Sequence, residues 1–146
     1  MKLQLACGQM PKPGFVNTDM VKLDGVDVVH DLNEVPWPWD DASATLIEGF
    51  DIFEHVDNPI AFITECHRIL KPGKFLHLHT SYWRNPDSYT DPTHKRFCTE
   101  NTFDYWCEGT FLYGRYNKAY GNVRFEKIDI HVGQDNYLDV TLKKLS

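Results

Sequence analysis

Hydrophobic and polar residues alternate in short runs through the first third of the chain, which predicts strands rather than helices. In the first run, residues 2–6, Leu3 and Leu5 fall on one face while Lys2 and Gln4 fall on the other. Three further runs have strand composition, and they are residues 15–19, 26–30 and 44–50. We therefore expect four strands before the first helix.

The clearest helix lies just after residue 56. Asp57 or Asn58 can cap its start, Pro59 suits its first turn, and the sequence Lys-Pro-Gly at 71–73 ends it. Its apolar positions recur at helical spacing and predict one broad buried stripe. The stripe comprises Ile60, Phe62, Ile63, Cys66, His67, Ile69 and Leu70.

The rest of the chain predicts three further strands and one helix. A fifth strand is expected over residues 74–80, and a second helix from Thr99 to about Cys107. Residues 124–132 and 137–145 are expected to form a hairpin around a turn at 133–136. Strands that alternate with helices and end in a hairpin predict an α/β fold, here a compact Rossmann-like, mostly parallel sheet with a C-terminal antiparallel hairpin.

Two links between the early strands are unusually short. Residues 7–14 and 20–25 are too few for a crossover helix, which with its loops needs at least about 10–12 residues. We therefore expect the sheet to lack the helices after its first two strands. One face of the sheet would then be uncovered, and we expect a homodimer to form through this face.

Composition limits the class of protein. A length of 146 residues fits one domain, residues 1–146, and the net charge of −6 disfavours binding to nucleic acid. No stretch approaches the ~20 apolar residues that span a bilayer, so no membrane partner is expected. The four cysteines form no CxxC pair, which favours a reduced, cytoplasmic setting.

Small and acidic residues follow the predicted strands. In an open α/β sheet, ligands bind beyond the carboxyl ends of the strands. There a carboxylate such as Asp19 can accept hydrogen bonds from a ribose diol, and Asp31 can accept one from an adenine amino group. Taken singly, each residue has a plainer interpretation as a turn or a strand-end cap. The candidates are Ala6, Cys7, Gly8, Asp19, Asp31, Leu32, Gly49 and Phe50.

The order and spacing of these segments carry more information than any one of them. The segments LQLACG, GFVNTD, VHDLNEVPWPWDDAS, FDIFEHVDNP and ECHRILKPGKFLHLHT resemble the class I S-adenosylmethionine-dependent methyltransferases. The closest likeness is to compact members related to the methyltransferase type 11 domain, and it covers roughly residues 3–106. The resemblance implies methyl transfer from S-adenosylmethionine to a small or exposed acceptor.

The resemblance also implies a role for each strand-end residue. Ala6, Cys7 and Gly8 would form the loop under the amino-acid part of the cofactor, and Asp19 would bind its ribose. Met20, Asp31 and Leu32 would contact the adenine, with Gly49 and Phe50 in the pocket wall. The chain departs from the family pattern where Gln4 and Ala6 replace an acid and a glycine. An alternative is therefore a non-catalytic module that binds S-adenosylmethionine or S-adenosylhomocysteine, or that serves assembly.

The segment from Asn85 to Phe97 is expected to lie over the site, because it follows the fifth strand. Within it His94 could act as a base oriented by Asp91, and Arg96 could bind an anionic acceptor. The same residues also make a good turn, so a bracing role stays open. Four aromatic residues could line an acceptor cleft or pack in the core, and they are Tyr82, Trp83, Tyr89 and Tyr113.

Histidines supply the remaining alternative. His77 and His79 lie two apart on one predicted strand face, so they could converge on a metal, with His55 or His94 as a third ligand. That arrangement would suit a metal-dependent hydrolase. Histidine pairs on strands often only hydrogen-bond across a sheet, and the acids show no ligand-like spacing. We therefore expect no metal site.

Overall fold

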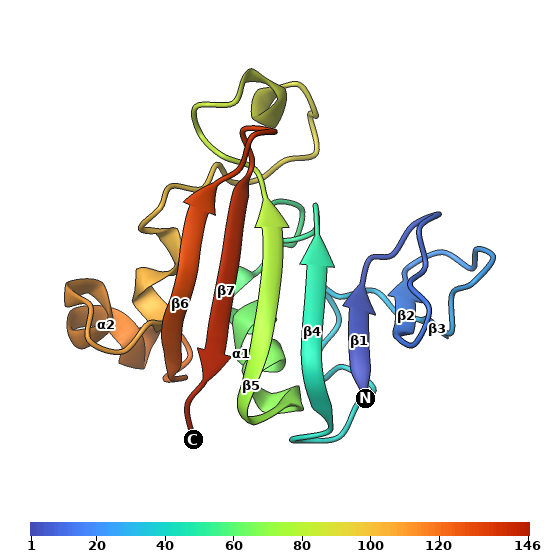
Figure 1. Ribbon diagram of the computed structural model, residues 1–146, viewed down its shortest axis with the longest axis horizontal. Coiled ribbons are helices and arrows are strands. Elements are labelled where there is room, and N and C mark those ends of the chain that lie inside the picture. The colour runs from blue at the N-terminus through green and yellow to red at the C-terminus, as the bar shows by residue number, and fades with distance from the viewer.

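The computed structural model describes residues 1–146 and is built on one seven-stranded sheet (Figure 1). The order across the sheet is β3-β2-β1-β4-β5-β7-β6, in which β1 to β5 are parallel and β7 is antiparallel to both neighbours. This confirms the predicted α/β sheet with its C-terminal antiparallel hairpin. The strands are β1 (Lys2–Leu5), β2 (Val16–Asp19), β3 (Val28–Val29), β4 (Ala44–Phe50), β5 (Leu70–Thr80), β6 (Phe125–Val132) and β7 (Leu138–Lys144).

Helical structure is sparse. The α-helices are α1 (Pro59–Ile69) and α2 (Phe111–Tyr116), and short 3₁₀ segments span Pro86–Tyr89, Thr102–Trp106 and Asn117–Ala119. No helix is long and apolar enough to cross a membrane. The α-helix predicted from Thr99 to Cys107 is wrong, because only the 3₁₀ segment forms there. Phe103 and Trp106 are both buried, and side chains three residues apart share a face in the tighter 3₁₀ geometry.

Helix α1 forms as its sequence predicts. The Asn58 side chain caps it by accepting hydrogen bonds from the backbone N–H groups of Ile60 and Ala61, each at 3.0 Å. The helix buries Phe62, Ile63, Glu65, Cys66 and Ile69.

The chain passes from α1 straight into β5 at Leu70, four residues before the predicted start of this strand at residue 74. The register explains the difference. Leu70 pairs with Ala44, whereas Phe75 pairs with Leu46, so the intervening residues bulge out of the ladder. Gly73 in this bulge has φ of +77°, a conformation that glycine adopts without steric cost. The Lys-Pro-Gly sequence therefore marks a bulge inside the strand instead of the loop before it.

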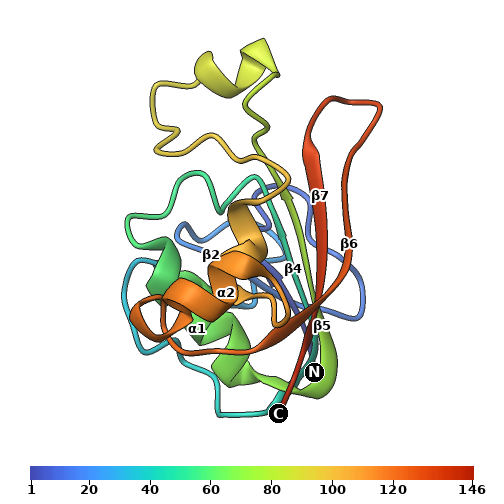
Figure 2. The same cartoon turned by 90° about the vertical axis from the view of Figure 1, so that its left-hand side faces the viewer.

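Both α-helices lie on one face of the sheet (Figure 2). The core forms there, where Leu3, Leu5, Ile47, Leu76 and Leu78 are each at most 1% exposed. No helix lies between β1 and β2 or between β2 and β3, as the short links predicted.

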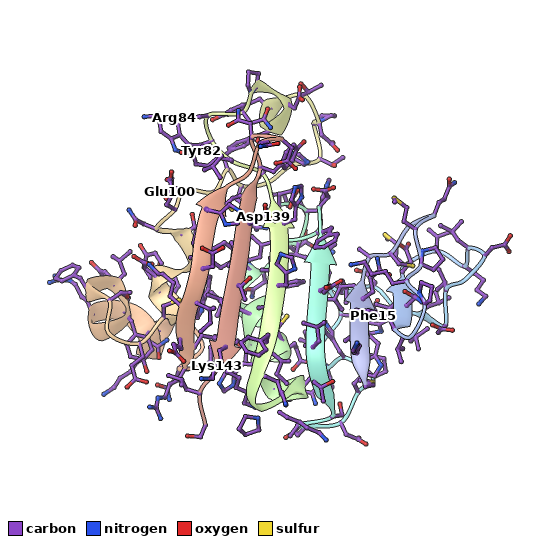
Figure 3. All side chains as sticks on the ribbon, in the orientation of Figure 1. Phe15, Tyr82, Arg84, Glu100, Asp139 and Lys143 are labelled. Atoms are coloured by element: carbon purple, nitrogen blue, oxygen red, sulfur yellow. The ribbon has the colours of Figure 1, made fainter.

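The opposite face carries polar and charged side chains. Figure 3 shows Asp139 and Lys143 on it, among the strands of the C-terminal half of the sheet. Phe75 is 38% exposed on the neighbouring strand. That a second copy covers this face stays a prediction.

The loop between β3 and β4 is fixed to the C-terminal half of α1. The Trp37 backbone N–H donates to Glu65 at 2.7 Å, and the Trp37 indole N–H donates to the Leu32 carbonyl at 3.1 Å. Arg68 adds hydrogen bonds to Glu65 and to the Trp39 carbonyl, each at 2.8 Å. These contacts hold Leu32 at the sheet edge where β1, β2, β3 and β4 end.

Candidate functional site

Three hollows open at the carboxyl edge of the sheet. We name them the strand-end hollow, the loop hollow and the acidic hollow. The strand-end hollow includes Ala6, Asp19, Met20, Asp31, Leu32 and His55 in its lining. The loop hollow includes Gln4, Ala6, Cys7, Lys12, Phe50 and Asp51. The acidic hollow, of about 400 Å³, is lined by Asp51, Glu54, His55, Asp87, Thr90, Asp91, His94 and Tyr137.

The hollows share lining residues in pairs. Ala6 lines both the strand-end hollow and the loop hollow. Asp51 lines the loop hollow and the acidic hollow, and His55 lines the acidic hollow and the strand-end hollow. The three spaces therefore meet around one region at the ends of β1 and β4.

The loop after β1 has the backbone of a glycine loop although its first residue is alanine. Ala6 has φ of +50° and Gly8 has φ of +54°. An alanine is expected at negative φ, and Ala6 departs from this preference. The left-handed conformation costs a non-glycine residue about 1–2 kcal/mol, a strain that the surrounding contacts must offset. One such contact is the hydrogen bond from the Cys7 N–H to the Thr18 carbonyl at 2.9 Å.

Asp19 connects the two loops that flank the strand-end hollow. Its Oδ2 accepts a hydrogen bond from the Gly8 N–H at 2.9 Å, and its Oδ1 accepts one from the Val21 N–H at 3.1 Å. Each carboxylate oxygen has a second lone pair, so both can still accept from a ligand. On the other side, Asp31 accepts from the Asn33 N–H at 2.9 Å, beside the buried Leu32.

Five of the nine predicted cofactor residues thus line one hollow, and the other four lie elsewhere. Phe50 and Cys7 line the loop hollow, so Phe50 is not in the wall of the hollow that Asp31 lines, where the resemblance had placed it. Gly8 lines none of the three hollows, because its N–H faces Asp19. Gly49 lines none either.

Gly49 faces the core instead of a pocket wall. A Cβ on Gly49 would lie 3.0 Å from Ile52 Cγ2 and 3.1 Å from Leu78 Cδ2, so this position needs glycine for close packing. Ile52, two residues beyond the strand, lines the strand-end hollow in its place. Alternation along β4 explains the difference, since Gly49 points to the helix-covered face and Phe50 to the open one.

Sequence reasoning missed the polar residues of the loop hollow. The Lys12 ammonium forms an ion pair with Glu48 and lies 4.5 Å from the centre of the Phe50 ring. The Gln4 side chain accepts from the Lys12 N–H at 3.0 Å and donates to the Met10 carbonyl at 3.1 Å. Gln4 therefore holds the loop down, which is a structural use for the residue that replaces the family acid.

In the acidic hollow, His94 is oriented by a backbone carbonyl. Its Nδ1 lies 2.7 Å from the Ser88 oxygen, so Nδ1 carries the proton and donates it. The lone pair of Nε2 is then free, 3.7 Å from Asp91 Oδ2 and 4.0 Å from Glu54 Oε1. The Ser88 carbonyl therefore holds the Nδ1 side of the ring, and Asp91 lies beside Nε2, so the role of Asp91 toward His94 stays a prediction.

Glu54 is fully buried between β4 and α1. Its Oε2 accepts a hydrogen bond from Thr80 at 2.7 Å, whereas its Oε1 has no partner. Burial raises the pKa of the Glu54 carboxyl, because the charged form loses its solvation. Glu54, His55 and His94 each offer one ligand atom, and these atoms lie within 4.8 Å of one another.

The other histidines do not join that group. His77 lies on the open face of the sheet, with Nδ1 4.0 Å from Glu48 and Nε2 3.7 Å from Asp139. His79 bonds to Asp51 and Asp135. The alternative of a metal centre on His77 and His79 is therefore wrong, because neither ring brings a ligand atom to the group that Glu54, His55 and His94 form.

Arg96 and the predicted aromatic residues lie outside the acidic hollow. The Arg96 guanidinium donates to the Phe53 carbonyl at 2.5 Å, so it braces the chain and does not face an acceptor. Tyr82 is buried and bonds to Glu100 at 2.6 Å, and both lie in the segment beyond the end of β5 that Figure 3 labels. Tyr137, from the turn before β7, supplies the aromatic wall and was not predicted.

His79 clamps the rim of the acidic hollow. Its Nδ1 lies 3.2 Å from Asp51, its Nε2 lies 2.7 Å from Asp135, and its ring stacks on Tyr137 at 4.9 Å. The hydrogen bond to Asp51, with that to Asp135, raises the pKa of His79 to about 9. The protonated ring of His79 therefore joins β5 to the loop after β4, which contains Asp51, and to the turn before β7, which contains Asp135.

This clamp predicts a pH dependence of stability. Because the pKa of His79 is higher in the folded chain than the ordinary 6.5, its stabilisation is fully present below pH 6.5 and is lost as pH rises through about 9. The melting temperature of the wild type should exceed that of His79→Gln by a margin that shrinks across this range. Thermal denaturation of both proteins from pH 6 to pH 10 measures it. A margin that stays constant would contradict the clamp.

The comparisons with known proteins agree with this geometry. Residues 11–78 match a protein family described as a methyltransferase domain. Over 49 residues the chain is 41% identical to a Mycolicibacterium smegmatis protein named "Probable S-adenosylmethionine-dependent methyltransferase". That match covers 33% of this chain but only 18% of the relative.

Solved structures extend the similarity to nearly the whole chain. A SAM-dependent methyltransferase from Thermotoga maritima superposes with a TM-score of 0.72 at 13% identity, covering 98% of this chain and 81% of that one. A 4+2 cyclase superposes with a TM-score of 0.68 at 13% identity, covering 99% and 74%. At such identities the likeness shows the fold and not the reaction.

The sheet order defines the chain as a Rossmann-like protein, and the strand-end hollow lies at the carboxyl edge of its sheet, where open α/β sheets bind ligands. Within that class, residues 11–78 match the methyltransferase domain family, and the fold is similar to that of S-adenosylmethionine-dependent methyltransferases. The cofactor of that family is S-adenosylmethionine.

Proposed function

We propose that this chain transfers a methyl group from S-adenosylmethionine to an acceptor bound in the acidic hollow. The proposal rests on how the three hollows connect. Each pair of hollows shares one lining residue, and these residues are Ala6, Asp51 and His55. A cofactor with a nucleoside part, an amino-acid part and a reactive centre between them needs two connected spaces of its own. A third space must open beside the reactive centre for the acceptor.

The strand-end hollow suits the nucleoside. Asp19 offers two carboxylate oxygens with free lone pairs to a ribose diol, and Asp31 offers one to an adenine amino group. Leu32 and Met20 supply apolar contact on the same hollow. The residues present therefore fit the group that the family implies.

The loop hollow suits the amino-acid part. Family members hold its carboxylate with a helix N-terminus, which this chain lacks after β1. Lys12, which lines the hollow, offers an ammonium group in its place. Glu48 lies behind it, paired with Lys12, and could offer an anion to the amino group. We propose that Lys12 replaces the missing helix N-terminus. Glu48 would replace the family acid, whose position is taken by Gln4 in this chain.

When bound, S-adenosylmethionine supplies an electrophilic methyl group on a cationic sulfur. The chain has to position the acceptor for an in-line displacement, keep water out, and take up a proton from the acceptor. His94 has a free Nε2 lone pair in the acidic hollow, which suits it to hold that proton. A place for a second reactant favours methyl transfer over a non-catalytic binding module.

Titration calorimetry with S-adenosylhomocysteine tests the proposal, because this product occupies the same site without turning over. We expect saturable binding to one site per chain. A chain that binds neither S-adenosylhomocysteine nor S-adenosylmethionine would contradict the proposal.

The role of Lys12 gives a sharper prediction. Lys12→Met should weaken S-adenosylhomocysteine binding about fivefold, the ~1 kcal/mol of an ion pair whose lysine side chain is 34% exposed. Binding of 5′-methylthioadenosine, which lacks the amino-acid part, should not change. Lys2→Met, at the opposite end of β1, is the matched control. Equal losses for both ligands would show that Lys12 only braces the loop.

A further inference from the structure

The acidic hollow has a strongly one-sided charge. Its eight lining residues comprise four carboxylates, two histidines, Thr90 and Tyr137, and no lysine or arginine. His79 lies behind Asp51 and is shared with Asp135. A concave site lined by one sign of charge concentrates ligands of the opposite sign.

The four carboxylates differ in how much of their hydrogen-bonding capacity is already used. Asp51 bonds to His79, and Asp91 accepts the Thr93 hydroxyl at 2.7 Å. The Asp87 carboxylate, by contrast, makes no hydrogen bond or ion pair, and it is exposed at the mouth.

Glu54 gives a second reason to expect a ligand in the acidic hollow, and this reason does not depend on the number of charged residues there. It is 0% exposed, and its Oε1 has no partner although it faces the hollow 4.0 Å from His94 Nε2. A buried carboxylate oxygen without a partner is costly, because it loses hydration without regaining a hydrogen bond. Native proteins retain such an atom mainly where a ligand or a proton completes it.

We infer that the methyl acceptor is an amine, which enters the acidic hollow as its ammonium ion. This inference rests on the proposed function and names the substrate class of that same site. Asp87 and Asp91 attract the cation at the mouth, and Tyr137 lies beside its organic part. An acceptor that carries a carboxylate or phosphate would instead meet repulsion from all four acids.

The histidine converts the ammonium into a nucleophile. The ammonium N–H gives its proton to the Nε2 lone pair of His94, which leaves a neutral amine and an imidazolium. Asp91 Oδ2 at 3.7 Å and Glu54 Oε1 at 4.0 Å lie next to the new N–H, and the Ser88 carbonyl holds the other one. The amine nitrogen then forms a bond to the methyl carbon as the carbon–sulfur bond breaks, and the electron pair of that bond stays on sulfur.

Three probes of similar size test the inference, because they differ in charge. They are 2-phenylethylamine, 2-phenylethanol and phenylacetate. Affinity for each is measured by ligand-observed NMR, with and without saturating S-adenosylhomocysteine. We expect the amine to bind at least about fivefold more tightly than the alcohol, with phenylacetate weakest, and the preference to fall at 0.5 M salt.

A pair of charge-matched variants locates the binding. Asp87→Asn should weaken amine binding about two- to fivefold, as expected for an exposed ion pair. Asp40→Asn removes the same charge in the exposed loop before β4, at the opposite end of the sheet, and should change nothing.

The outcomes separate the two proposals. If S-adenosylhomocysteine fails to bind while the amine preference persists, the proposed function fails and the cation site remains. If the amine binds no better than the alcohol or phenylacetate, the amine inference is overturned. Micromolar Co²⁺ binding that Glu54→Gln abolishes, and that blocks the amine, would also overturn it, because the hollow would then be a metal centre.

Discussion

Replacing Asp19 with alanine is expected to weaken S-adenosylhomocysteine binding by about 1–3 kcal/mol, which is about 5- to 150-fold in the dissociation constant. The carboxylate would pair with both ribose hydroxyls, and it also holds the Gly8 and Val21 N–H groups that shape the hollow. Removing it leaves the ligand hydroxyls and the partly buried Gly8 N–H without a partner. Titration calorimetry measures the loss directly.

Two controls make the Asp19 result interpretable. Asp24→Ala removes an exposed acid from the turn after β2 and should leave the affinity unchanged. A melting temperature for each variant shows whether the strand-end loops still fold. Unchanged affinity in a folded Asp19→Ala protein would show that the ribose site is elsewhere.

Replacing His94 with alanine is expected to lower methyl transfer to an amine that the hollow binds by about 10²- to 10⁴-fold, the usual contribution of a positioned base. Affinity for S-adenosylhomocysteine should stay the same, because His94 does not line the strand-end hollow or the loop hollow. A radiolabelled methyl-transfer assay beside calorimetry separates the two effects.

The matched control for His94 is His131→Ala, since His131 is exposed on β6, away from the acidic hollow. It should leave turnover unchanged. Loss of the base should be partly reversed at high pH, where more of the amine is already neutral. Full turnover in His94→Ala would show that the ring only braces the loop through Ser88.

The sequence predicts the sheet and the strand-end acids because both depend on local pattern. The alternation of Leu3 with Gln4, the Asn58 cap and the short links after β1 and β2 all have local physical causes. Asp19 and Asp31 follow from these, because parallel strands bring their carboxyl ends to one edge.

The features that could not be predicted depend on contacts between distant segments. The positive φ of Ala6 violates the preference of its residue type, so only the folded loop shows it. Lys12 lies in an irregular Pro-Lys-Pro loop without periodicity, and its partner Glu48 is 36 residues away. The orientation of His94 is set by a backbone oxygen, which no side-chain pattern encodes.

A crystal structure with S-adenosylhomocysteine bound would show whether the cofactor lies across the strand ends. We predict the adenine beside Asp31 and Leu32, the ribose hydroxyls on Asp19, and the sulfur in the region where Ala6, Asp51 and His55 join the three hollows. Electron density for the ligand outside the strand-end hollow, or a hollow closed by protein side chains, would contradict it.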